Sequence, residues 1–192
     1  MNLLQRLFPF VETLASGEEV QINRRPSTVV AVGVPWLSVA LGSLLTTNLW
    51  VASAPLLPPL GLLILIAWRQ LRPGVQPVWA GLPLGLFDDL VSGQPMGSAV
   101  LLWSAALLLL DALEARVPWR NFLIEWVVAS VLIAAAIVLG ALIANVTGGA
   151  TPLVFTAPQI GVSILIYPLV GRFVARLDRM RRLPFLEVRA WD

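Results

Sequence analysis

The sequence predicts an all-α integral membrane protein with six transmembrane helices and both chain ends in the cytoplasm. Of its 192 residues, 58% are hydrophobic and only 12% are charged, about half the charged fraction of a typical soluble domain. Apolar segments follow one another along the chain, and the arginines gather at alternate connections between them. The length fits one membrane domain with several spans.

An N-terminal extension, residues 1–27, precedes the apolar segments. Its apolar side chains recur at helical spacing, which favours an amphipathic helix on the cytoplasmic membrane surface or against a cytoplasmic partner. A frayed terminal helix is the alternative. The membrane domain then covers residues 28–175, and residues 176–192 form an arginine-rich cytoplasmic tail.

Six apolar segments within the membrane domain are the predicted spans. A spanning helix needs about 20 residues, with about 17–25 tolerated. The third and fourth segments are short and are interrupted by glycine and proline, whereas the other four are long enough. The segments cover residues 28–45, 49–67, 78–91, 96–110, 122–144 and 153–174.

The arginines set the predicted orientation. The chain has 13 basic residues, all of them arginine. If the N-terminus is cytoplasmic, every arginine falls in a cytoplasmic region, and the outside connections around Thr47, Ser92 and Gly148 hold none. This distribution follows the positive-inside rule for six spans. Five arginines form a predicted basic anchor for anionic lipid head groups or a cytoplasmic partner: Arg172, Arg176, Arg179, Arg181 and Arg182.

A ladder of small residues marks the third and fourth segments. Gly81, Gly85, Gly93 and Gly97 are spaced four or eight residues apart, and Asp89 fills the one gap in this four-residue repeat. Small residues at this spacing let helix backbones approach closely in a membrane. The sequence therefore predicts that these five residues form a helix-packing or partner-contact surface, at a turn where two segments meet.

Two adjacent carboxylates, Asp88 and Asp89, lie toward the outer end of the third segment. Neighbouring positions on a helix point about 100° apart, so at most one shares the face of the glycines, and Asp89 is the one in register. We expect Asp89 to face a partner helix or an internal cavity and Asp88 to face external water, since acids at membrane depth avoid lipid. The alternative is that both are solvated at a helix end.

The composition argues against most kinds of catalysis. There is no histidine and no cysteine, so the commonest general base and metal ligand, disulfides and thiol chemistry are missing. The sequence has no phosphate-binding glycine loop. Its arginines are dispersed along membrane edges rather than gathered on one soluble face, which argues against nucleic-acid binding. We therefore expect no enzyme activity, no cofactor and no metal.

The motif Gly85-Leu86-x-x-Asp89-x-x-x-Gly93-x-x-x-Gly97, which opens the second half of a small six-span chain, resembles the MreD family of rod shape-determining proteins. The resemblance covers roughly residues 28–180 through span number, orientation and the arginine-rich C-terminus. Asp89 matches the family aspartate, and Asp88 is an additional acid.

The resemblance implies a non-enzymatic inner-membrane scaffold of the bacterial elongation machinery, which binds MreC and helps to direct lateral peptidoglycan synthesis. It implies MreB, RodA and a class B penicillin-binding transpeptidase as further partners, direct or indirect. The family is also similar in fold to the substrate-binding subunits of ECF-type vitamin transporters. The alternative is therefore a small-molecule transporter subunit, which needs a pocket with several convergent polar groups.

Overall fold

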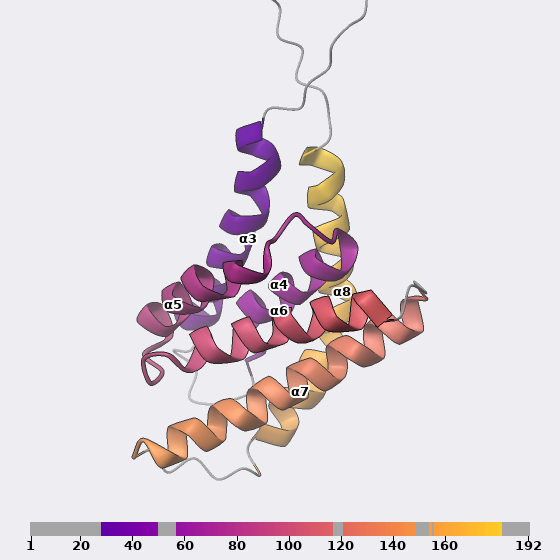
Figure 1. Ribbon diagram of the computed structural model, residues 1–192. Helices are drawn as coiled ribbons and strands as arrows, with labels where there is room; N and C mark the ends of the chain where they lie inside the picture. Colours follow the sequence, from indigo (N-terminus) through magenta and orange to yellow (C-terminus); the bar gives the residue numbers. More distant parts are fainter. Residues whose placement is uncertain (1–27, 50–56, 117–120, 149–153, 155, 182–192) are drawn as a thin grey trace, which may run out of the picture.

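The fold is all-helical in the computed structural model, which describes residues 28–49, 57–116, 121–148, 154 and 156–181. Over these residues the chain forms six α-helices and one short 3-10 helix, with no strand. Figure 1 shows their arrangement. The elements are α3 (Thr28–Leu49), α4 (Leu60–Leu71), η1 (Val78–Ala80), α5 (Gly81–Ser92), α6 (Ser98–Arg116), α7 (Phe122–Val146) and α8 (Thr156–Arg181).

Three of these helices, α6, α7 and α8, are long and apolar enough to cross a membrane. They contain 19, 25 and 26 residues, and at about 1.5 Å per residue even the shortest nearly matches a hydrocarbon core of about 30 Å. Their outward surfaces carry exposed aliphatic side chains, among them Leu101, Leu108, Val131, Leu165 and Leu169. Such a surface suits a lipid environment.

Helix α4 is the centre of the molecule. Every residue from Gly61 to Arg69 is buried, and the helix contacts α3, α6, α7 and α8. A helix that is apolar all round is expected where other helices surround it. The side chains of Leu63, Leu65, Ile66 and Trp68 are fully enclosed and form the middle of the hydrophobic core.

The start of α4 differs from the predicted second segment, which covered residues 49–67. Helix α3 continues to Leu49, and α4 begins only at Leu60. Pro58 and Pro59 explain the late start, because proline lacks a backbone N–H and disfavours helical geometry in the residue before it. With 12 residues, α4 is about 18 Å long. The other five predicted segments each coincide with a helix, with η1 and α5 together forming the third.

The C-terminal ends of α4, α6 and α8 meet through ion pairs. The pairs are Arg69 with Asp111 and Glu114, Arg72 with Asp178, and Arg181 with Asp178. We call this side of the molecule the arginine end. The C-terminal ends of α3, α5 and α7 lie with the N-terminal ends of α4, α6 and α8 on the other side, which we call the arginine-free end. The predicted N-terminal extension, residues 1–27, lies outside the described residues.

Helices α5 and α6 pack backbone against backbone. A Cβ atom at Gly81 would lie 2.7 Å from the backbone nitrogen of Ser104, and one at Gly85 would lie 2.7 Å from the backbone nitrogen of Val100. Real side chains do not occupy such positions, so only glycine permits this antiparallel contact. Gly93 and Gly97 act differently: their φ angles of 67° and 93° place them in the left-handed region, where they shape the turn between the helices.

We predict that Gly85→Ala lowers the free energy of unfolding in detergent by about 1–3 kcal/mol, the usual effect of overpacking. The added methyl group meets backbone atoms of α6, which cannot rotate away. Gly171→Ala is the control, because Gly171 lies in α8 with no atom within 4 Å of the added carbon. Chemical denaturation checks both variants. Equal stability of the two would contradict the close contact of α5 and α6.

Candidate functional site

Asp89 joins the end of α5 to the beginning of α6. Its carboxylate is 2% exposed. Oδ1 accepts hydrogen bonds from the Ala99 N–H at 2.8 Å and from the Ser98 hydroxyl at 3.0 Å, and Oδ2 accepts from the Gly97 N–H at 2.9 Å and the Val100 N–H at 3.4 Å. These N–H groups begin a helix and have no partner within it, and the helix dipole favours a negative charge there. The charge of Asp89 is therefore stabilised within the chain.

The predicted ladder is divided between two structural tasks. Gly81 and Gly85 pack against α6, and Gly93 and Gly97 form the turn that Asp89 spans. Asp89 faces α6, in agreement with its register on the face of Gly85. A direct contact between this ladder and another protein stays a prediction.

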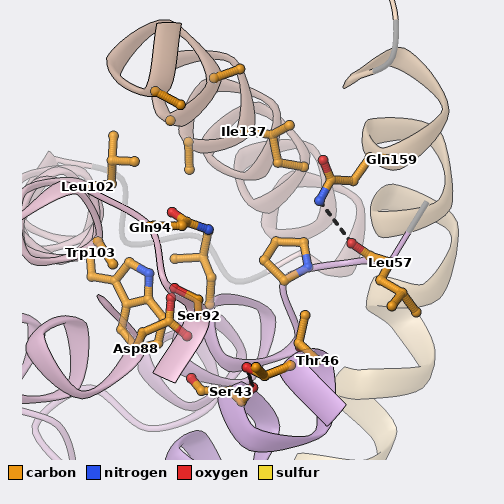
Figure 2. A pocket seen from close by; sticks show the side chains of 18 of the residues that line it. Ser43, Thr46, Leu57, Asp88, Ser92, Gln94, Leu102, Trp103, Ile137 and Gln159 are labelled. Atoms are coloured by element: carbon orange, nitrogen blue, oxygen red, sulfur yellow. Dashed lines mark hydrogen bonds between the residues drawn. The ribbon is translucent and has the colours of Figure 1, made fainter. Parts of the chain in front are cut away.

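A pocket of about 260 Å³ lies at the arginine-free end. Figure 2 shows it from close by, with side chains from several helices converging on it. The lining residues are Ser43, Thr46 and Thr47 of α3; Leu57, Pro59 and Leu62 in and before α4; Asp88, Ser92 and Gln94 of α5 and its turn; Ala99, Leu102 and Trp103 of α6; Ala136, Ile137, Gly140, Ala141 and Ala144 of α7; and Thr156 and Gln159 of α8.

The late start of α4 explains why the pocket lies here. The first N–H group of the helix, from Leu60, donates to Oγ1 of Thr46 at 3.2 Å, so α3 holds the beginning of α4 in place. On the opposite side, Nε2 of Gln159 in α8 donates to the carbonyl oxygen of Leu57 at 2.8 Å (Figure 2). An open space remains in front of the N-terminal end of α4, between α3, α6, α7 and α8. Small residues on α7, such as Gly140 and Ala144, keep it open.

Asp88 is half-buried and lines this pocket. In Figure 2 it lies with Ser92 and Gln94 on the side of the pocket away from Gln159. Among the residues that the structure describes, no arginine forms an ion pair with it. The sequence could not reveal this arrangement, because the lining comes from six helices with no common periodicity.

The predicted basic anchor lies on the last turns of α8. Arg172, Arg176 and Arg179 are exposed. Arg181 is engaged inside the protein, where it pairs with Asp178 at 2.8 Å and stacks over the Trp68 ring at 5.4 Å. Arg182 lies outside the described residues. A lipid-binding role for the exposed arginines stays a prediction.

Comparison with known protein families decides the relationship of this chain. The family model for rod shape-determining protein MreD matches residues 28–181, a range that contains every described helix. The chain belongs to the MreD family. The family match confirms the resemblance found in the glycine and aspartate motif, and it assigns the chain to rod shape determination. The Asp89 turn and the pocket both lie within the matched residues.

Searches among curated proteins and among solved structures give no match. The expected likeness to substrate-binding subunits of ECF-type transporters therefore has no support from a related structure.

We predict that Asp89→Ala lowers the free energy of unfolding by about 2 kcal/mol or more, because several donors lose their acceptor. Asp88→Ala is the matched control, since Asp88 caps no helix. Thermal unfolding in the same detergent compares the two variants. A loss of equal size in both would show that Asp89 does not hold the α5–α6 turn.

Proposed function

We propose that this MreD-family chain is a non-enzymatic scaffold in the bacterial inner membrane that binds MreC and helps to direct lateral peptidoglycan synthesis. The observation that carries the proposal is the pocket at the arginine-free end. The family relationship implies MreC, a membrane-anchored protein with its bulk in the periplasm, as a direct partner. MreB, RodA and a class B penicillin-binding transpeptidase then join the scaffold directly or through MreC.

In this proposal the chain crosses the membrane six times with both ends in the cytoplasm. The arginine end faces the cytoplasm and the arginine-free end faces the periplasm, in line with the positive-inside rule. The short helices are compatible with this arrangement: α4 is enclosed by its neighbours, and irregular backbone at membrane depth is tolerated where protein buries it. Exposed Arg172, Arg176 and Arg179 would then meet anionic lipid head groups.

The pocket is proposed to receive a membrane-proximal segment of MreC. It opens among helix ends on the side that this proposal assigns to the periplasm, where the bulk of MreC would lie, and most of its wall is apolar, with Leu62, Leu102, Trp103 and Ile137 among the lining residues. Apolar side chains of an entering segment would gain free energy from burial there.

The pocket of about 260 Å³ lies just below the range of about 300–1,000 Å³ that is usual for small-molecule sites. This volume accommodates one or two side chains of an entering segment. The transporter alternative stays an outcome of the experiment below.

We predict that Gly140→Phe reduces recovery of MreC with the purified protein by about 10-fold or more, since the ring fills the pocket that the segment needs. A Cβ atom at Gly140 makes only ordinary contact, 3.5 Å from Leu102 Cδ1. Gly161→Phe is the control, because Gly161 lies in open space on α8. Both variants are co-expressed with MreC and purified in mild detergent.

Unchanged MreC recovery with Gly140→Phe would remove the pocket from the interface. Co-purification of a vitamin with wild-type protein, and its loss in Gly140→Phe, would instead support the transporter subunit.

We predict that a green fluorescent protein fused to the C-terminus is fluorescent and that alkaline phosphatase fused there is inactive. Phosphatase inserted in the turn between α5 and α6 should be active, because this turn lies at the arginine-free end. Whole-cell fluorescence and phosphatase assays read both positions. An active phosphatase at the C-terminus would contradict the six-span arrangement.

A further inference from the structure

Asp88 is an acid whose charge the described chain leaves unbalanced. It lines the pocket at the arginine-free end, and no arginine in the described residues pairs with it. All basic residues of the sequence fall in the regions predicted for the other membrane face. Acids at the arginine end have arginine partners, among them Asp111 and Glu114, which pair with Arg69.

Two serine hydroxyl groups lie in the same part of the pocket wall. Ser43 is 2% exposed, lines the pocket and lies near the Asp88 carboxylate. Neither its hydroxyl nor that of Ser92 has a partner with hydrogen-bond geometry. Buried polar groups normally find a partner. Three oxygen-bearing groups therefore converge on one side of a cavity whose wall is mostly apolar (Figure 2), with the Ser43 hydroxyl beside the Asp88 carboxylate.

This wall restricts what can fill the pocket. A purely apolar occupant would strip water from the Asp88 carboxylate and leave it unpaired, which is strongly unfavourable. An occupant that brings a positively charged donor replaces the lost water and gains a charge-assisted hydrogen bond. The best complement is one cationic group next to apolar groups that pack on Trp103, Leu102 and α7.

We propose that Asp88, with Ser43 and Ser92, forms a subsite for the guanidinium or ammonium group of an arginine or lysine carried by the protein segment that enters the pocket. The proposal rests on the proposed function, in which that segment belongs to MreC. Asp88 is the residue that selects it, because among the lining residues it alone carries a charge. The pocket volume of about 260 Å³ accommodates such a side chain with an apolar neighbour.

The test measures the affinity of purified MreC for Asp88→Asn, which removes the charge and keeps the shape. We expect a loss of about 10–100-fold, typical of truncating one partner of a buried charge pair. Asp88→Glu, which keeps the charge, should retain more affinity than Asp88→Asn. Thermal unfolding should be unchanged in both, since Asp88 caps no helix. Ser43→Ala should weaken binding less than Asp88→Asn does.

A charge exchange identifies the partner residue and serves as a second, independent variant. Asp88→Arg should abolish binding of wild-type MreC. Changing the basic residues of the membrane-proximal segment of MreC to aspartate one at a time should yield one variant that restores binding to Asp88→Arg. If no such variant restores binding, the proposal is overturned.

The possible outcomes distinguish a failure of the cation subsite from a failure of the proposed function. If wild-type protein binds MreC and Gly140→Phe abolishes binding, but Asp88→Asn binds like wild type, the pocket is the interface and the cation subsite is wrong. If Asp88→Asn instead changes only the amount of co-purified phosphatidylethanolamine, measured by mass spectrometry, the subsite belongs to a lipid amine and the proposal is overturned. If wild-type protein does not bind MreC, the proposed function itself fails.

Discussion

The backbone contact between α5 and α6 is the constraint on which the arginine-free end depends. Gly81 and Gly85 allow the two helices to touch, and Asp89 then satisfies the first free N–H groups of α6. The contact and the hydrogen bonds support each other, because a carboxylate so deeply buried is stable only if donors surround it. The same arrangement fixes the preceding residue, Asp88, in the pocket wall. The end of α5 therefore carries two acids. Asp89 accepts hydrogen bonds from α6, whereas Asp88 has no arginine partner among the described residues.

A short central helix explains the other half of the site. Because Pro58 and Pro59 delay the start of α4, the core is filled at the arginine end and left open at the opposite end. The buried face of α4 is continuous from Gly61 to Arg69, so the fold retains a tightly packed interior below the pocket. The longer helices α3, α6, α7 and α8 provide most of the walls of the pocket. The packed core and the pocket can coexist because they lie at different depths of the same helix bundle.

Much of this fold could be predicted from the sequence, because apolar length and arginine position are local signals. The helices from α5 to α8 lie where the apolar segments predicted them, and the turn lies between Gly93 and Gly97 as expected. The start of α4 was predicted too early, since the apolar character of residues 49–59 outweighed the prolines. The pocket could not be predicted, because Ser43, Asp88 and Gln159 become neighbours only through packing. Whether Asp88 meets water or a cavity depends on the same packing.

The acidic side chains at the two ends of the molecule have different kinds of partner. At the arginine end, acids and arginines of α4, α6 and α8 neutralise one another, and Arg181 even covers the Trp68 ring. At the arginine-free end the described residues offer no arginine for that task, so Asp89 relies on backbone N–H groups, and Asp88 is left to solvent or to another molecule. A buried or half-buried acid is unfavourable unless a cation, hydrogen-bond donors or water offset its burial. If the arginine-free end faces the periplasm, as proposed, the same uneven distribution of arginine that orients the chain also leaves Asp88 without a cation from its own chain.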